Sequence, residues 1–281
     1  MSINENGDYQ NDMNALEVPQ ATQDFLIYEQ ERINFNSEFS FLREHKGWRS
    51  GKMALLLAPT HAGKSTFVRS ILWDAVINNP GINIGIWLSE ESVSEFRTEV
   101  AKMRIPWSTI TCLIDVFSEQ DDDLSIDSIE KRIRAKNYEL LIFDNITTSQ
   151  VYNNKTNYEQ ARISKRIKKI TQDVNCSTII IAHTDGKAGT KNSLIEENNI
   201  RGDKSLPNLV QFCYALQRFY ISSPDGGDVY YTIIRTLKHR GYNCKNILHQ
   251  LVYTPESFSF QRDHVIPWDK FKEVYDNRRT L

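Results

Sequence analysis

The chain has 281 residues, 40% of them hydrophobic, and a formal net charge of -2 at pH 7. This length suits one large α/β domain or two small ones, and no apolar run approaches the roughly 20 residues that cross a bilayer, so we expect no membrane partner. The first residues lack a basic region, which excludes a secretory signal, and the four cysteines form no C-x-x-C pair, so we expect a cytoplasmic protein.

The amino-terminal part of the chain differs in composition from the rest. Residues 1–22 contain acidic residues but no Lys or Arg, which predicts a disordered acidic tail. Residues 23–47 are rich in large apolar side chains, so we expect a short helical or linker segment that packs on the core or on a neighbouring subunit. The remaining residues, 48–281, form the main domain.

Strands alternate with helices from Gly51 onward. The predicted strands are Met53–Leu57, Ile82–Leu88, Thr111–Val116, Leu140–Asp144, Thr178–Ala182, Tyr214–Tyr220 and Val229–Leu237. The predicted helices are residues 64–78, 92–103, 125–136 and 157–173. This alternation favours an α/β fold with a mostly parallel twisted sheet and helices on both faces. We expect a carboxy-terminal antiparallel hairpin over residues 247–253 and 257–261.

A phosphate-binding loop follows the first predicted strand. Its sequence is close to G-x-x-x-x-G-K-[ST], with Ala58 in the place of the first glycine. We expect Lys64 to reach the β- and γ-phosphates of ATP and the Ser65 hydroxyl to hold Mg²⁺. A chance Gly-Lys-Ser is the alternative, which the strand before and the helix after disfavour. The predicted nucleotide-binding residues are Ala58, Pro59, Thr60, His61, Ala62, Gly63, Lys64, Ser65 and Thr66.

Carboxylates end two further predicted strands. Asp144 ends an apolar strand, and we expect it to support Mg²⁺, although a strand-end Asp is often only a turn residue. Glu90 and Glu91 follow the strand Ile82–Leu88, which we expect to lie beside the first strand, close to the γ-phosphate. Glu90 is the candidate general base that polarises the attacking water. The alternative, an acid that merely begins a helix, fits Glu91 better.

His183 ends another buried strand, where it would contact the γ-phosphate and report hydrolysis to the next loop; the alternative is a His that only caps the strand. The loop that follows contains Gly and Lys, which suits contacts to nucleic-acid phosphates. The candidate DNA-binding residues are Lys187, Lys191, Arg201 and Lys204, with plain solvated charge as the alternative. The basic face of the helix Tyr158–Asp173 is a second choice for DNA.

A Lys-x-Arg pair, Lys238 and Arg240, follows the strand Val229–Leu237. In ring ATPases such a pair reaches the γ-phosphate of the neighbouring subunit as an arginine finger, which demands a head-to-tail interface. A basic strand end on the surface is the alternative, and this segment alone does not separate the two. The candidate catalytic residues are therefore Lys64, Glu90, His183, Lys238 and Arg240.

Taken together, the motifs over residues 48–262 resemble the RecA-type helicase domain of the DnaB-like replicative helicases, above all that of phage primase-helicases and their mitochondrial relative Twinkle. The segments that carry the resemblance are Gly63–Arg69, Leu88–Val93, Asp144, His183, Ile200–Gly202 and Leu237–Arg240. The resemblance implies a RecA-like P-loop NTPase core that uses ATP and Mg²⁺. It also implies that Arg240 is the finger and Lys238 its companion.

The resemblance further implies a homo-oligomer, a hexameric ring that moves 5′ to 3′ along single-stranded DNA and separates the duplex ahead. Because few residues precede the core, we expect a separate primase or replication protein as a partner, and a phage or mobile element as the origin. Two alternatives stay open. One is a RecA- or RadA-like recombination ATPase that coats DNA as a filament, and the other is a helicase-loader or adaptor ATPase.

Overall fold

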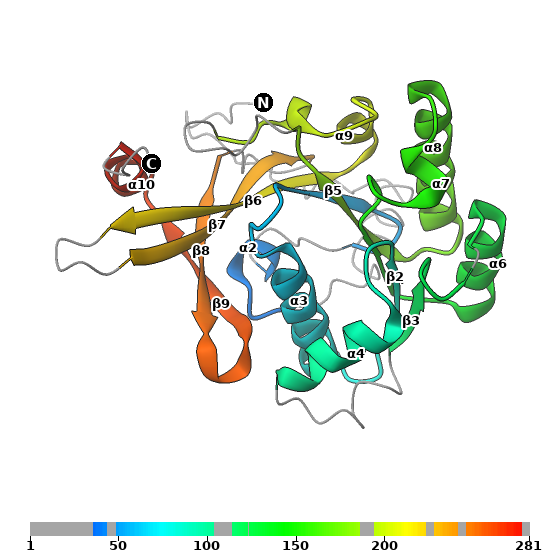
Figure 1. The fold of residues 1–281 in the computed structure, drawn as a ribbon, viewed down its shortest axis with the longest axis horizontal. Helices are drawn as coiled ribbons and strands as arrows, with labels where there is room; N and C mark the ends of the chain where they lie inside the picture. Colours follow the sequence, from blue (N-terminus) through cyan, green and yellow to red (C-terminus); the bar gives the residue numbers. More distant parts are fainter. Residues whose placement is uncertain are drawn as a thin grey trace, which may run out of the picture. The chain divides into compact units, whose positions relative to one another are not determined.

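The computed structural model describes residues 36–43, 49–103, 114–122, 124–185, 194–222, 228–240 and 246–276, all of which lie in one compact unit, residues 34–281. The predicted tail, residues 1–22, lies outside the described residues. The described strands form one nine-stranded sheet in the order β3-β2-β4-β5-β1-β6-β7-β8-β9 (Figure 1).

The strands are β1 (Met53–Ala58), β2 (Ile84–Leu88), β3 (Ile114–Ser118), β4 (Leu140–Asp144), β5 (Ser177–His183), β6 (Phe212–Ser222), β7 (Asp228–His239), β8 (Leu248–Thr254) and β9 (Ser259–Ile266). The α-helices are α2 (Ser40–Arg43), α3 (Lys64–Asn78), α4 (Val93–Lys102), α6 (Ile126–Lys136), α7 (Gln150–Asn153), α8 (Asn157–Asp173), α9 (Leu206–Leu209) and α10 (Trp268–Asp276). Among the described residues, no helix is both long and apolar enough to span a bilayer.

The sheet has a parallel part and an antiparallel part. Strands β3, β2, β4, β5, β1 and β6 run parallel, whereas β7, β8 and β9 continue the sheet in antiparallel order. The predicted fold class, a mostly parallel sheet with helices and a carboxy-terminal antiparallel hairpin, is confirmed.

Helices cover both faces of the parallel part, which is why its strands are continuously apolar. All six residues of β1 are buried, and they alternate between two cores. Leu56 belongs to the core that includes Phe67 of α3, whereas Leu57 belongs to the core that includes Ile167 of α8. The central strand is therefore enclosed on each side, and only its ends are open to a ligand.

The predicted helices agree with the observed ones to within one residue at each end. Side-chain caps explain this agreement. Ser92 caps α4 and Thr156 caps α8, each in a reciprocal capping box with the glutamate three residues later. Such caps depend on neighbouring residues only, so the sequence reveals them.

Strand boundaries were predicted less well. The third strand was placed at residues 111–116, whereas β3 runs from Ile114 to Ser118, and residues 111–113 lie outside the described residues. Ile82 was assigned to a strand, but its N–H donates to the Asn79 carbonyl in the turn that ends α3. The extension of β9 to Ile266 and the helix α10 were not predicted.

One prediction about strand order was wrong. The strand that leads to Glu90 was expected beside the first strand, but β4 and β5 lie between β2 and β1. The alternation of strands and helices does not encode which strands pair, because a crossover helix can return the chain to any free position in the sheet.

The amino-terminal segment, residues 36–43, packs on the core of the same chain. Phe39 and Phe41 are buried and their rings lie about 6 Å from the ring of Phe67. Asp74 of α3 accepts hydrogen bonds from Ser37 Oγ and Glu38 N, and Asp263 of β9 accepts from Ser40 N and Ser40 Oγ. The segment thus connects α3 to the hairpin β8–β9.

Candidate functional site

The phosphate-binding loop connects the end of β1 to the start of α3. Gly63 has φ of 86°, a left-handed conformation that favours glycine, and it precedes Lys64, the first residue of α3. Ala58 is the last residue of the extended strand β1, so its Cβ causes no strain, and this explains why alanine replaces the first glycine of the motif. The backbone amides at the start of α3 then point at the place where phosphates would bind.

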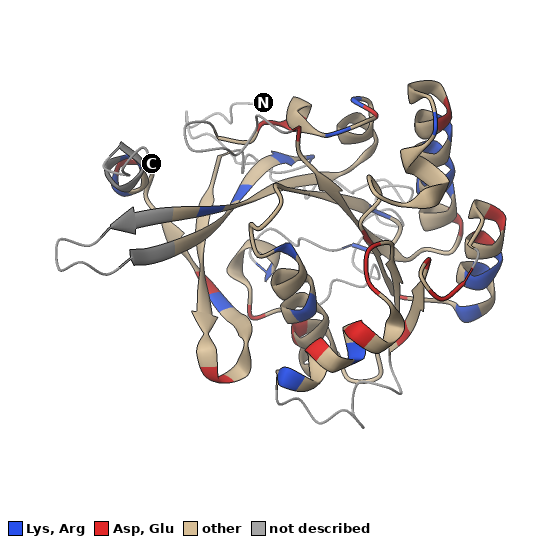
Figure 2. Cartoon of the chain, in the orientation of Figure 1, with Lys and Arg blue, Asp and Glu red and all other residues tan. Residues whose placement is uncertain are grey.

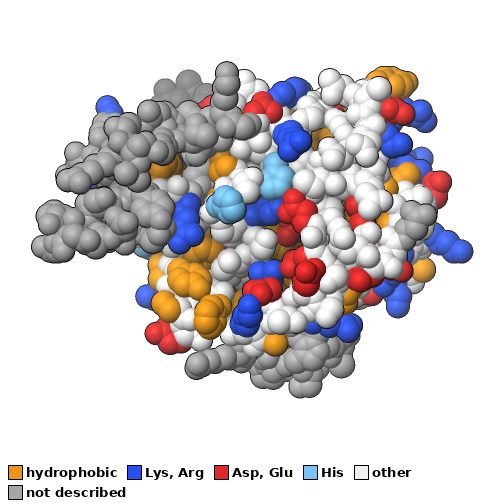
Figure 3. Space-filling view, in the orientation of Figure 1, with side chains coloured by type: hydrophobic (Ala, Val, Ile, Leu, Met, Phe, Trp, Pro, Cys, Tyr) orange, Lys and Arg blue, Asp and Glu red, His pale blue; other side chains and the backbone are white. Residues whose placement is uncertain are grey.

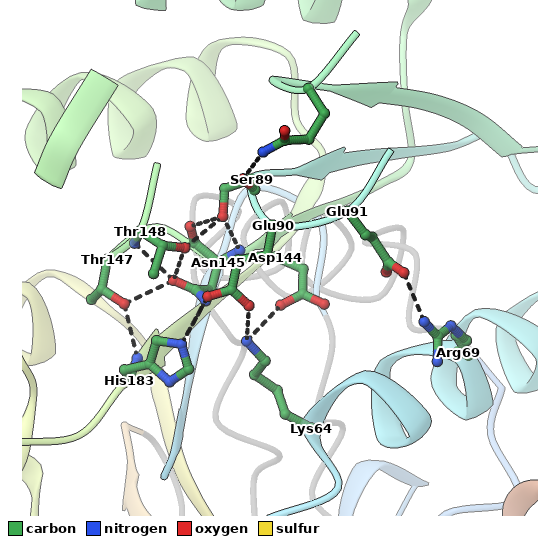
Figure 4. A network of polar contacts seen from close by, with 11 residues as sticks. Lys64, Arg69, Ser89, Glu90, Glu91, Asp144, Asn145, Thr147, Thr148 and His183 are labelled. Carbon is green, nitrogen blue, oxygen red and sulfur yellow. Dashed lines mark hydrogen bonds and ion pairs between the residues drawn. The ribbon is translucent and has the colours of Figure 1, made fainter. Parts of the chain in front are cut away.

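Four predicted residues lie together at this loop. Lys64 Nζ lies 3.3 Å from Glu90 Oε2 and 3.4 Å from Asp144 Oδ1, and Glu90 Oε1 lies 3.1 Å from His183 Nε2 (Figure 4). Glu90 reaches Lys64 although β2 is not adjacent to β1, because all these side chains follow the carboxyl ends of parallel strands. Lys64, Glu90, Asp144 and His183 therefore form one cluster.

The electrostatics of the two acids differ. The hydrogen bond with His183, aided by the charge of Lys64, lowers the pKa of Glu90 to about 2. Burial raises the pKa of Asp144, and the charge of Lys64 opposes that effect. Glu91 points elsewhere and pairs with Arg69 at 2.8 Å. This pairing agrees with the assignment of Glu90, rather than Glu91, to the site.

A magnesium ion fits the oxygen atoms beside Lys64. Asp144 is buried, and apart from the ion pair with Lys64 at 3.4 Å its Oδ1 has no hydrogen-bond partner among the described residues. Ser65 follows Lys64 in the first turn of α3. A hydroxyl and a carboxylate are the oxygen ligands that Mg²⁺ accepts beside phosphate and water. Ser65 and Asp144 are therefore the residues that would hold it.

A pocket of about 390 Å³ opens over the cluster. It is lined by most of the phosphate-binding loop together with Glu90, His183 and Arg218. The face drawn in Figure 3 has basic, acidic and histidine side chains gathered near its centre, with an apolar patch beside them. Arg218, on β6, was not predicted. The signal in the sequence that could have revealed it is that Arg218 is the one charged residue in the mostly apolar run of residues 212–221.

A second pocket adjoins the first. It has a volume of about 550 Å³, shares Gly63, Thr66 and Arg218 with the first pocket, and extends to Tyr253 and Phe260. The rings of Tyr253 and Phe260 pack edge to face, with centroids 5.6 Å apart. Since both aromatic residues belong to the hairpin β8–β9, the last strands of the sheet complete this part of the site.

Asn145 is a further residue that the sequence analysis missed. It is buried directly after Asp144, and its side chain contacts His183, Thr147 and Thr148. The polar run Asn-Ile-Thr-Thr-Ser after an apolar strand was its only signal.

The predicted finger residues, Lys238 and Arg240, lie near the start of β1, away from the phosphate-binding loop at its end. His239 pairs with Phe212, and Phe212 pairs with Ala54 near the start of β1, whereas the phosphate-binding loop follows the end of β1. Lys238 Nζ donates to the Pro207 carbonyl and Arg240 donates to the Asn208 carbonyl. Burial, with the charge of Arg240, lowers the pKa of Lys238. The structure therefore does not bring this pair to its own phosphate-binding loop.

Of the predicted DNA-binding residues, Lys187 and Lys191 lie outside the described residues. Arg201 is exposed, and its backbone N–H donates to the carbonyl of His183. Lys204 Nζ contacts Asp185 at 2.6 Å and also the carbonyls of Asn198 and Ile200. Lys204 thus holds the two ends of the predicted DNA loop together.

Basic residues also follow the outer face of α8 (Figure 2). Arg162, Lys165 and Lys169 are exposed there, whereas Arg166 pairs with Asp127 and Glu130 of the helix α6. Part of this positive charge is therefore neutralised within the chain.

The comparisons with known proteins support the fold. No family model matches the sequence, and a search of the curated proteins finds no match. Among solved structures, the chain is similar to a KaiC-like protein from the hyperthermophilic archaeon Pyrococcus horikoshii OT3, with a TM-score of 0.63 and 15% sequence identity. The similarity covers 84% of this chain and 100% of that one. At 15% identity, this similarity shows a shared RecA-like fold and says nothing about activity.

Proposed function

We propose that the chain binds ATP with Mg²⁺ and hydrolyses it. The observation that carries the proposal is the cluster in which Lys64 contacts both Glu90 and Asp144 at the mouth of a pocket lined by the phosphate-binding loop. Phosphate oxygens would compete with these carboxylates for Lys64, which leaves Glu90 beside the γ-phosphate to accept a proton from the attacking water. Magnesium held by Ser65 and Asp144 would draw negative charge from the phosphates.

The nucleoside has a place in the adjoining pocket. With the phosphates at Lys64, the ribose and base would extend past Gly63 and Thr66, toward Arg218 and Tyr253, which line the adjoining pocket. An aromatic ring and a guanidinium group both stack on a purine base. Arg218 belongs to both pockets, so it connects the phosphate part of the site to the base part.

The finer proposal is an ATP-driven DNA helicase that moves along single-stranded DNA. It is supported by the resemblance of the motifs to DnaB-like helicases and by the position of the loop after His183. That loop begins two residues after His183, and its far end returns to pair Ile200 with Thr184. A change at His183 would therefore reach the loop that contains Lys187, Lys191 and Arg201. We further propose that subunits assemble in a ring and that a separate primase or other replication protein cooperates with them.

A forked DNA duplex tests both levels of the proposal. Wild-type protein with ATP and Mg²⁺ should separate the strands when a 5′ single-stranded tail is present. The Lys64→Ala variant should neither hydrolyse ATP nor unwind the duplex. Hydrolysis with filament formation on DNA, but without unwinding, would favour the recombination ATPase. Hydrolysis that is independent of DNA would favour the loader or adaptor ATPase, and a wild-type protein that hydrolyses no nucleotide would refute the proposal.

A further inference from the structure

We propose that the exposed face of α8 binds single-stranded nucleic acid, with lysine and arginine side chains for the phosphates and Tyr158 for a base. The inference rests on the proposed function only for the class of its ligand, and it does not depend on ATP hydrolysis. The starting observation is a local excess of positive charge. Residues 155–173 contain six basic and two acidic residues, whereas the whole chain has a net charge of -2. The basic side chains follow the outer face of the helix (Figure 2).

The exposed face is a regular stripe along α8. Four exposed residues form this α8 stripe, namely Tyr158, Arg162, Lys165 and Lys169. Spacings of four, three and four residues place them on one face, over about 16 Å of helix. Each lies two positions before a buried residue, and these buried residues are Gln160, Ser164, Ile167 and Thr171. Because two residues turn a helix by about 200°, the stripe points directly away from the core.

The cations of the α8 stripe are not neutralised within the described part of the chain, where none of the three has an ion pair. Three acids of α6 and α8 are paired instead with Arg134 and Arg166, and these acids are Asp127, Glu130 and Asp173. A polyanion that binds the stripe therefore releases counterions without breaking an ion pair of the protein.

A groove of about 320 Å³ adjoins the stripe at the start of α8. Its lining combines cations with apolar side chains and consists of Ile126, Lys155, Glu159, Arg162, Ile163 and Arg166. Glu159 is the one acid among these residues, and its carboxylate accepts hydrogen bonds from the N–H and the hydroxyl of Thr156 in the helix cap. Three cations around an apolar surface suit a phosphate joined to a sugar and a base.

Tyr158 distinguishes between kinds of polyanion. It is 74% exposed and stands at the amino-terminal end of the basic stripe. An aromatic ring stacks on an unpaired base, which a single strand offers and a duplex hides. An acidic protein segment would use the cations but has no base to stack on the ring. The exposed ring therefore favours single-stranded nucleic acid.

A predicted DNA-binding residue lies on the neighbouring segment. Ser164 Oγ of α8 donates to Asp203 Oδ2 at 3.3 Å. A Cβ added at Gly202 would lie 2.9 Å from Gln160 Oε1, so the glycine permits a close approach to the helix. Arg201, which is exposed, directly precedes this contact. The α8 stripe and the predicted contact at Arg201 are therefore on adjoining elements.

Fluorescence anisotropy with labelled oligo-dT, in the absence of nucleotide, tests the cations. The triple variant Arg162→Gln/Lys165→Gln/Lys169→Gln should bind more weakly than wild type. Its plot of log affinity against log salt concentration should be less steep by about 2, because each lost phosphate contact on a single strand removes about 0.7 from the slope. An unchanged slope would overturn the proposal.

The matched control is Arg97→Gln/Lys270→Gln/Lys272→Gln. It removes the same charge from exposed positions on α4 and α10, so the slope should stay at the wild-type value. An equal loss in both triple variants would show an effect of net charge alone and would contradict a site on α8.

Tyr158 separates a single strand from other polyanions. Tyr158→Ala should bind oligo-dT about 5- to 100-fold more weakly, and Tyr158→Phe, which keeps the ring, should bind like wild type. Neither change should alter binding of a blunt duplex. Unchanged affinity of Tyr158→Ala for oligo-dT would refute the stacking role. Polyglutamate that displaces labelled oligo-dT as well as unlabelled oligo-dT does would indicate an acidic protein partner and would also overturn the proposal.

These measurements are independent of hydrolysis. Lys64→Ala should bind oligo-dT as tightly as wild type, since Lys64 lies in the phosphate-binding loop and not on α8. Wild-type protein that binds oligo-dT through the stripe but hydrolyses no ATP would refute the ATPase and support the stripe. Wild-type protein that hydrolyses ATP but binds no oligo-dT would overturn the stripe and leave the ATPase standing.

Discussion

Lys64 connects the phosphate-binding loop to the two acids of the candidate site. It is 8% exposed, and its ammonium group is shared between Glu90 and Asp144. The neighbouring acid Glu91 belongs to a different ion pair, with Arg69. Two adjacent glutamates therefore have separate environments, and this difference permits a matched experiment.

Glu90→Gln should preserve nucleotide binding and lower kcat by about 10²- to 10⁴-fold, because the amide cannot accept the proton of the attacking water. Glu91→Gln should keep most of the turnover, since Glu91 pairs with Arg69 and not with Lys64. Nucleotide affinity by calorimetry and steady-state hydrolysis measure the two effects. Equal losses in both variants would remove the assignment of Glu90 as the base.

Gly85 is required for packing rather than for chemistry. A Cβ at this position of β2 would lie 2.8 Å from the ring of Tyr138. Tyr138 donates a hydrogen bond to Asp115, which restrains its ring. Gly85→Ala should lower the free energy of unfolding by about 1–3 kcal/mol, measured by urea denaturation. Tyr138→Phe in the same background removes the restraint and should recover part of the loss, and an unchanged stability of Gly85→Ala would contradict the packing argument.

At the scale of elements, the amino-terminal segment joins α3, which begins with Lys64, to the hairpin that contains Tyr253. Two carboxylates make the connection, and their pKa values move in opposite directions. Burial raises the pKa of Asp74, whereas hydrogen bonds from His249 and Ser40 outweigh burial and lower the pKa of Asp263. These two acids therefore add to the direct contact between α3 and β9, in which the Phe260 N–H donates to Ser70 Oγ.

Asp263→Asn should destabilise the protein at neutral pH by about 1–3 kcal/mol, since it removes a charged acceptor of buried hydrogen bonds. A lowered folded-state pKa contributes stability above the ordinary value of 3.8 and loses it as pH falls through the folded value, so the cost should shrink on acidification. Urea denaturation at several pH values measures it.

Asp74→Asn is the internal comparison for this experiment. Because its pKa is raised, wild-type Asp74 favours folding more as pH falls, so the cost of the substitution should grow on acidification. Parallel trends for the two variants would contradict the assignment of opposite shifts.

At the scale of the whole molecule, the predicted finger residues Lys238 and Arg240 lie at one end of strand β1, and the phosphate-binding loop lies at the other. Lys238 and Arg240 lie beside the start of β1, and Lys64 follows its end, so a strand of about 20 Å separates them. One chain cannot bring Arg240 to its own phosphates. A finger role would thus require a second copy of the chain in a head-to-tail contact.

Arg240→Ala should leave nucleotide binding intact and abolish turnover in the assembled protein. The control variant Arg97→Ala, at an exposed position on α4, should keep both nucleotide binding and turnover. Mixing Arg240→Ala with Lys64→Ala subunits should restore part of the hydrolysis, because a site with Lys64 can then receive Arg240 from its neighbour. Full activity of assembled Arg240→Ala protein, or no recovery on mixing, would exclude the finger.

The sequence alone determined the features that depend on neighbouring residues. The phosphate-binding loop is one continuous segment, the buried strands are continuous apolar runs, and the helices begin at caps such as Ser92 and Thr156. The grouping of Glu90, Asp144 and His183 could be expected because each lies at or just after the end of a parallel strand, and all such ends meet at one edge of a sheet.

Only the tertiary structure decided the features that depend on strand order and on pairs of residues far apart in the chain. It placed β4 and β5 between β1 and β2, brought Arg218 and Tyr253 to the pocket, and set Asn145 against His183. It also placed Arg240 far from the phosphate-binding loop of its own chain. The reason is physical. Capping and periodicity are local interactions, whereas the pairing of strands is chosen by the packing of the whole sheet and its covering helices.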